Sequence, residues 1–233
     1  GPDSEGKYID DGIALGFRRL SIIDLAQGDQ PILNEDGTKI LLFNGEIYNF
    51  QDLRKDLVDA GHIFKTKTDS EVLLHGYEEY GTDLLNKLRG MFSFVIWDKN
   101  KKEIFGARDF FGIKPLYYAL MNDTFMFGSE IKSFLAHPNF KKELNEAALE
   151  NYLTFQYSPT TETFFKNVYK LPAAHYFIYK DGNLTTKETT RIDGQVNGDV
   201  FSNGNIIVGD QGSVNGSITA YSVFASGKVV GNV

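Results

Sequence analysis

Runs of β-branched and aromatic residues, bounded by glycine, asparagine and aspartate, recur through the first 186 positions and predict strands. The predicted strands are Ile13–Leu15, Leu20–Ile23, Ile40–Phe43, Met91–Trp97, Glu103–Ala107, Leu116–Leu120, Thr124–Gly128 and Ala174–Tyr179. Apolar residues spaced three and four positions apart predict helices over Phe50–Ala60, Ser70–Tyr80, Asp83–Leu88 and Leu144–Phe155.

The order of these elements indicates an α+β fold. Strands outnumber helices, hairpins follow one another, and the helices come in pairs. Two stacked, largely antiparallel sheets with helices on the outside fit this order. A Rossmann sheet would need a regular strand–helix–strand alternation, which the pattern lacks.

The character of the chain changes near residues 187–190. Residues 191–233 hold eight glycines and eight valines, and Arg191 and Lys228 are their only basic residues. We therefore expect one domain over residues 1–186, a short polar linker at 187–190, and a second unit over 191–233.

The second unit contains a repeat. Val196-x-Gly198-x-Val200 returns eighteen residues later as Val214-x-Gly216-x-Ile218, and fifteen residues after that as Val229-x-Gly231-x-Val233. Such units predict a β-solenoid, here a short right-handed β-helix whose β-branched residues stack inward. A single hairpin sheet is the alternative, although it does not explain the repeat length. Because uncapped end coils expose unpaired backbone, we expect self-association through this tail.

Composition and charge exclude several classes of function. The net charge of −7 argues against a nucleic-acid partner. No apolar run reaches membrane-spanning length and no signal peptide opens the chain, so we expect a cytoplasmic protein. The absence of cysteine excludes disulfides, thiolate metal sites and a cysteine nucleophile. The histidines lack metal-ligand spacing, and we therefore expect no metal site from His62, His75, His137 or His175.

The segment Asn44-Gly45-Glu46 carries the candidate chemistry. It follows the apolar run Ile40–Phe43 and presents an amide, a glycine and a carboxylate in succession. A backbone N–H beside a carboxamide N–H is a donor pair that stabilises a developing oxyanion. The alternative is a simple turn, because Asn-Gly is the commonest two-residue hairpin signal.

Charged residues complete the candidate site. Arg19 lies on a predicted strand that is otherwise largely apolar, where a ligand carboxylate or a structural salt bridge would compensate its burial. Asp69 precedes a predicted helix whose N-cap is Asp69 or Ser70, and a capping carboxylate at Asp69 can also bind an ammonium group. With Glu46, these residues would suit an amino acid that carries a side-chain carbonyl. Arg108-Asp109 is interpreted as an ion pair that holds a turn.

Seven motifs follow one another in a fixed order along residues 1–186. They are Gly1-Pro2-Asp3-Ser4-Glu5-Gly6, Arg19-Leu20-Ser21-Ile22-Ile23-Asp24, Gly28-Asp29-Gln30-Pro31, Asn44-Gly45-Glu46-Ile47-Tyr48-Asn49, Thr68-Asp69-Ser70-Glu71, Gly90-Met91-Phe92-Ser93-Phe94, and Arg108-Asp109 followed by Gly112-Ile113-Lys114-Pro115-Leu116-Tyr117-Tyr118. Together they resemble the glutamine-hydrolysing domain of asparagine synthetase. That domain is a class II glutamine amidotransferase of the N-terminal-nucleophile fold, an αββα sandwich of two antiparallel sheets.

The resemblance implies a role for each candidate residue. Arg19 would bind the α-carboxylate of L-glutamine, Asp69 and Glu46 its ammonium group, and Asn44 with the Gly45 N–H would form the oxyanion hole. In the family, an N-terminal cysteine attacks the glutamine amide and releases ammonia through a thioester. We expect that cysteine, with the strand and helix after it, to precede Gly1, so the chain as given should lack glutaminase activity. Phe17 stands where the family often has histidine.

The resemblance also implies partners and cofactors. Ammonia would reach an aspartate activated by ATP, with Mg²⁺, in a synthetase domain that is absent from this sequence, so we expect no cofactor in this chain. Residues 191–233 resemble a bactofilin, a polymer-forming β-helical cytoskeletal protein, through Arg191-Ile192-Asp193-Gly194 and Gly227-Lys228-Val229-Val230-Gly231-Asn232-Val233. The alternative function is therefore a structural assembly protein, or a fusion that carries an inactive amidotransferase fragment.

Overall fold

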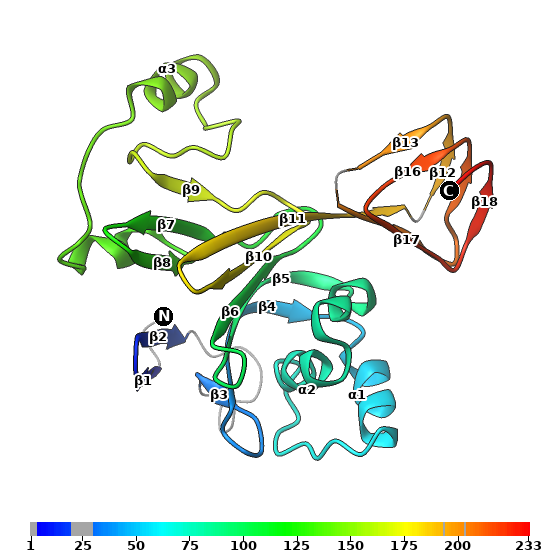
Figure 1. Cartoon of the computed structure of the whole chain (residues 1–233), viewed down its shortest axis with the longest axis horizontal. Helices are drawn as coiled ribbons and strands as arrows, with labels where there is room; N and C mark the ends of the chain where they lie inside the picture. Colours follow the sequence, from blue (N-terminus) through cyan, green and yellow to red (C-terminus); the bar gives the residue numbers. More distant parts are fainter. Residues whose placement is uncertain (1–3, 20–29, 193, 203) are drawn as a thin grey trace.

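The computed structural model describes residues 4–19, 30–192, 194–202 and 204–233 (Figure 1). The predicted strand Leu20–Ile23 lies outside these ranges. Within them, no helix is both long enough and apolar enough to cross a membrane.

An eight-stranded sheet forms the centre of the protein, in the order β17-β14-β11-β10-β6-β5-β4-β3 (Figure 1). Its strands are β3 (Ile32–Leu33), β4 (Lys39–Ile47), β5 (Gly90–Asp98), β6 (Glu103–Arg108), β10 (His175–Lys180), β11 (Asn183–Ile192), β14 (Asn205–Val208) and β17 (Ser222–Ala225). Neighbours from β3 to β11 pair antiparallel, as predicted, whereas β11, β14 and β17 pair parallel.

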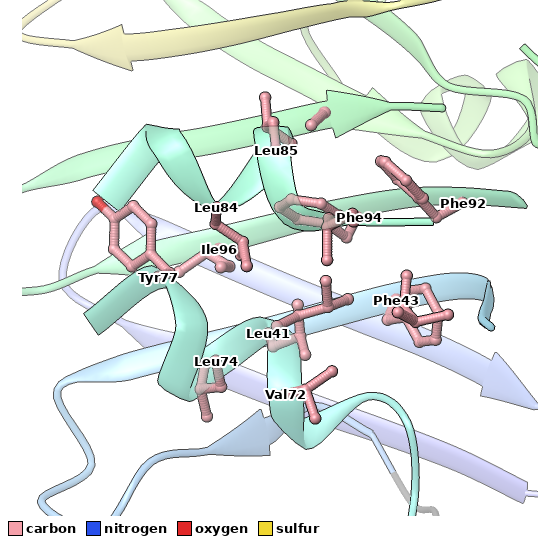
Figure 2. Close-up of a cluster of buried hydrophobic side chains, with 14 of the residues drawn as sticks. Leu41, Phe43, Val72, Leu74, Tyr77, Leu84, Leu85, Phe92, Phe94 and Ile96 are labelled. Carbon is pink, nitrogen blue, oxygen red and sulfur yellow. The ribbon is translucent and has the colours of Figure 1, made fainter. Parts of the chain in front are cut away.

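Helices cover one face of this sheet. They are α1 (Phe50–Asp59), α2 (Glu71–Tyr80) and the 3₁₀ helix η1 (Gly81–Lys87), where the sequence predicted an ordinary helix over Asp83–Leu88. Figure 2 shows Val72 and Leu74 of α2 near Leu41 of β4, with Leu84 and Ile96 beside them. Because Val72, Leu74 and Leu84 are completely buried, each contributes roughly 1.5–3 kcal/mol to this core.

A second antiparallel sheet covers the opposite face. Its order is β8-β7-β9, with β7 (Tyr117–Met121), β8 (Thr124–Gly128) and β9 (Val168–Lys170). Phe177 of the central sheet packs against Tyr118 and Phe125 of this sheet. On its far side lies the 3₁₀ helix η2 (Ile131–Ala136), through Phe134. The predicted α+β arrangement of two stacked antiparallel sheets is therefore confirmed.

Two elements lie at the margins of these layers. A hairpin of β1 (Ser4–Asp10) and β2 (Ile13–Arg19) forms its own two-stranded sheet. Helix α3 (Glu146–Phe155) lies away from the central sheet, with a single buried residue, Ala148 (Figure 1).

The tail consists of short strands that pair in parallel with the next repeat. β12 (Gln195–Asn197), β15 (Ser213–Asn215) and β18 (Lys228–Val230) form one sheet, and β13 (Val200–Phe201) pairs with β16 (Ile218–Thr219). The repeat sets the register, because Val196 lies opposite Val214 and Val214 opposite Val229. The alternative of a hairpin sheet is wrong, since hairpin strands would be antiparallel.

Strand β11 joins the tail to the central sheet. Residues 187–190, which the sequence analysis assigned to a linker, lie inside this strand. Its first part pairs with β10, and its last residues, Thr189 to Ile192, pair with β14 of the tail.

Candidate functional site

A cleft of about 1780 Å³ opens between β4, the β1–β2 hairpin, β8 and the segment before α2. Asn44, Gly45, Glu46 and Asp69 all line it. The structure thus brings together four of the five residues that the sequence analysis selected.

Strand β4 runs without interruption through Asn44 and Gly45. These residues pair with Ser93 and Phe92 of β5, and the ladder continues to Ile47 opposite Gly90. The hairpin-turn alternative for Asn44-Gly45 is therefore wrong. The pairing also explains why position 45 is a glycine. Its φ is +153°, and a Cβ at this position would lie 2.1 Å from the Met91 carbonyl oxygen.

Along the outer edge of β4 beyond Leu41, polar side chains bond to the backbone groups of the strand. The Gln30 side chain pairs with both backbone groups of Phe43: its Nε2 donates to the carbonyl at 2.8 Å, and its Oε1 accepts the N–H at 2.6 Å. Four residues on, the Ile47 N–H donates to Asp69 Oδ2 at 2.8 Å. Because alternate residues of a strand direct their N–H groups to the same side, the Gly45 N–H lies on this outer edge, between the other two.

Asp69 is held by β4 rather than by the helix that follows it. The α2 helix begins at Glu71, Ser70 occupies the N-cap position, and no side-chain bond caps the helix. Of the two predicted N-cap candidates, Ser70 therefore occupies the position, and the interpretation of Asp69 as the N-cap is wrong. Burial raises the pKa of the half-buried Asp69 carboxyl, and the nearby charge of Glu46 adds to this, while the Ile47 N–H opposes it. A cation placed between Asp69 and Glu46 would relieve both effects.

Arg19 and Asn44 lie on β2 and β4, two strands that border the cleft. Arg19 ends β2, where its backbone pairs with Ser4, but its side chain lies outside the described part of the structure. The Asn44 side chain extends toward β8, and its Nδ2 lies 3.4 Å from Ser129 Oγ.

A turn supports the back of the site. Arg108 donates to the carbonyl oxygens of Lys114 and Leu171, both at 2.7 Å, and also to that of Gly112. Fully buried Asp109 accepts N–H groups from Phe111, Ile113, Lys114 and Phe92, the last of which pairs with Gly45. The turn is architectural, as expected, but both side chains hold it through backbone groups rather than through an ion pair with each other.

Sequence reasoning missed Gln30 and Ser129 as parts of this cleft. Gln30 lies within the motif Gly28-Asp29-Gln30-Pro31, and that motif was the available signal. Ser129 follows β8 and has no local signal, because 85 residues separate it from Asn44.

Two protein families match this chain, and their matches overlap over residues 178–190. The sequence model of the glutamine amidotransferase domain matches residues 1–190, and that of bactofilin, described as polymer-forming cytoskeletal, matches residues 178–233.

Asparagine synthetase (glutamine-hydrolyzing) 1 of Bacillus subtilis (strain 168) is 47% identical over 188 residues, which cover 80% of this chain and 30% of that protein. Asparagine synthetase (glutamine-hydrolyzing) 2 of the same organism is 45% identical over 194 residues, covering 81% and 25%. The chain thus spans less than a third of either relative.

A solved structure shares the fold. The glutamine phosphoribosylpyrophosphate amidotransferase of B. subtilis, complexed with ADP and GMP, superimposes with a TM-score of 0.51 at 21% identity. The match covers 75% of this chain and 34% of that one.

Proposed function

This chain belongs to the glutamine amidotransferase domain family, in a class II form related to asparagine synthetase and followed by a bactofilin segment, and we propose that its cleft binds L-glutamine. Asp69 and Glu46 bind the ammonium group, Arg19 the α-carboxylate, and Asn44 Nδ2 with the Gly45 N–H the oxygen of the side-chain amide. The observation that carries the proposal is the outer edge of β4, where the Gly45 N–H lies two residues along the strand from the Ile47 N–H that binds Asp69.

The distribution of charge supports this orientation of the ligand. Two carboxylates, one of them with a raised pKa, gather at one end of the site and favour a cation there. The Asn44 carboxamide and the backbone edge at Gly45 are neutral donors, which suit a carbonyl oxygen that becomes negative during amide cleavage.

In this proposal the chain binds glutamine without cleaving it. Cleavage needs a nucleophile, and the sequence contains no cysteine. The transfer of ammonia to an ATP-activated aspartate, with Mg²⁺, belongs to a synthetase activity outside this chain. No cofactor is therefore assigned to the cleft.

Calorimetric titration with L-glutamine tests the assignment. Binding should be lost in Arg19→Ala and retained in Arg89→Ala, a control because Arg89 is exposed and is not among the residues that line the cleft. D-Glutamine should bind less tightly, because it cannot place both charged groups and the amide on their partners at once. Equal affinity of the Arg19→Ala variant and the unaltered protein would refute the carboxylate assignment.

The tail favours a second function, self-assembly. We propose that residues 191–233 form a β-helix that polymerises through its last repeat. Support comes from the parallel stacking of the repeats and from the end strand β18, where Val230 is 50% exposed. Electron microscopy should show filaments that Val230→Lys prevents and that Phe201→Lys, on another exposed position of the tail, leaves intact. A monodisperse unaltered protein would refute this proposal.

A further inference from the structure

Two histidines that the sequence places thirteen residues apart lie close together in the structure. His62 follows α1 and His75 lies inside α2, yet their ring centres are 5.1 Å apart. Glu35, from the loop between β3 and β4, joins them, and ligand atoms of the three residues all lie within 4.8 Å of one another. The sequence analysis expected no metal site from the histidines because of their spacing, and spacing along the chain does not show a cluster whose three residues come from separate segments.

We propose that Glu35, His62 and His75, with Glu78 as a fourth ligand, form a binding site for a divalent transition metal, Zn²⁺ in the first instance. The site is separate from the glutamine cleft, and nothing in it depends on the proposed glutamine binding.

Two of the three distances between the proposed ligand atoms suit a metal better than they suit hydrogen bonds. His75 Nδ1 lies 3.6 Å from Glu35 Oε1, and His62 Nδ1 lies 3.7 Å from Glu78 Oε2. Zn²⁺ with bonds of about 2.0–2.1 Å separates tetrahedral ligand atoms by about 3.3 Å. Only small side-chain shifts would therefore bring these two distances to the spacing of zinc ligands. The third, His75 Nδ1 to Glu78 Oε2, is 3.0 Å and would widen slightly.

Each histidine turns its second nitrogen toward another carboxylate. His62 Nε2 lies 3.3 Å from Glu79 Oε2, and His75 Nε2 lies 3.6 Å from Glu71 Oε1. Glu71 is itself held by the N–H groups of Lys65 and Thr66 and by the Thr66 hydroxyl, each at 2.7 Å. The His62–Glu79 contact is a carboxylate–histidine arrangement that fixes the tautomer and the orientation of a ligating ring, whereas His75 Nε2 is buried and makes no hydrogen bond to the described residues.

The local charge favours a divalent cation. Glu35, Glu71, Glu78 and Glu79 surround the two imidazoles, and Lys39 is the one lysine or arginine that the described residues place within 4.0 Å of any of these carboxylates, at 3.9 Å from Glu78. With neutral imidazoles the cluster carries three excess negative charges. Mixed imidazole and carboxylate ligands suit Zn²⁺ and its neighbours better than Mg²⁺ or Ca²⁺, which prefer oxygen alone.

The competing arrangement needs no metal. A doubly protonated His75, between Glu71 and Glu78, would supply one positive charge through ion pairs. His75 is 1% exposed, so that ring is fixed in either case. The two arrangements differ in their need for Glu35 and His62, because both are peripheral to the ion pairs but are ligands of the metal.

Titration of the metal-stripped, untagged full chain with Zn²⁺ at neutral pH distinguishes them. We expect saturable binding of one Zn²⁺ per chain, with a higher melting temperature as Zn²⁺ is added. His62→Gln and Glu35→Gln should each weaken binding at least tenfold, and Glu79→Gln about 10–100-fold. His137→Gln removes an exposed imidazole elsewhere and should leave binding unchanged.

The variants sit at partly exposed positions, so their folding can be checked by circular dichroism without Zn²⁺. His75→Gln is less informative, because that side chain is buried in the core of the cluster. No saturable binding, or equal binding by His62→Gln, Glu35→Gln and the unaltered chain, would overturn the proposal in favour of the protonated His75 arrangement.

Discussion

Replacement of Asp69 by asparagine separates the binding role of this residue from any structural one. The Asp69 carboxyl has a raised pKa, chiefly because it is desolvated, so its charge destabilises the free protein. Asparagine keeps an oxygen that can accept the Ile47 N–H, which Asp69 Oδ2 accepts at 2.8 Å. The free energy of unfolding of Asp69→Asn at neutral pH should therefore be equal to that of the unaltered protein or higher.

Glutamine binding should change in the opposite direction. The ammonium group of the ligand loses a charge-assisted hydrogen bond, which is worth about 1.5–3 kcal/mol. At about 1.4 kcal/mol per tenfold change, the dissociation constant should rise by about 10–150-fold. Urea denaturation and calorimetric titration of the same samples measure the two effects. Asp59→Asn, at an exposed position at the end of α1, is the matched control.

The pH dependence follows from the same group. Since the folded-state pKa of Asp69 is raised, its stability contribution is fully present below the unfolded value of 3.8 and is lost as the pH rises through the folded pKa. The advantage of Asp69→Asn in stability should thus appear only above that window. On acidification, glutamine affinity should begin to fall at a higher pH than it would if Asp69 had the pKa of an ordinary aspartate. A stability loss in Asp69→Asn together with unchanged glutamine affinity would refute the reasoning, because it would make the carboxylate purely structural.

Substitutions at three other positions test the scaffold by urea denaturation. Gly45→Ala should cost about 2–5 kcal/mol, since its Cβ would meet the Met91 carbonyl oxygen at a strained φ; a loss below 1 kcal/mol would mean that the strands can separate there. Gln30→Ala should cost about 1–3 kcal/mol, because both backbone groups of Phe43 lose their partner, and Gln30→Glu should restore only the acceptor. Asp109→Ala should cost about 3 kcal/mol or more, because it leaves several turn N–H groups unpaired; a smaller loss would show that water replaces the carboxylate.

Local patterns predicted the elements whose residues carry their own signal. Thr124–Gly128 forms β8 with the predicted bounds, because its aromatic alternation suits a strand between two turns. The register of the tail could also be predicted from the sequence, since each Val-x-Gly repeat places equivalent residues opposite one another. Strand β1 was missed, because the polar sequence of Ser4–Asp10 lacks an apolar run.

Tertiary contacts decided what the local patterns could not. Asn44-Gly45 carries a strong hairpin signal, yet the ladder with β5 keeps it extended. Asp69 precedes a helix but bonds to β4, because the Ile47 N–H on the open edge of that strand needs an acceptor. His62 and His75 show the same limit: their spacing matches no metal motif, and only the packing of α1 against α2 brings them together.

The two parts of the chain share one sheet, and this bears on whether they act independently. The match to the amidotransferase family ends at residue 190 and that to bactofilin begins at residue 178, so both include most of β11. Thr189 donates to the Ala174 carbonyl beside β10 and also pairs with Asn205 in the tail. A chain cut within residues 187–190 would therefore expose an unpaired edge on each fragment. Because β4 belongs to the same sheet, an assembled tail would hold the strand that carries Asn44 and Gly45 through a continuous hydrogen-bonded ladder.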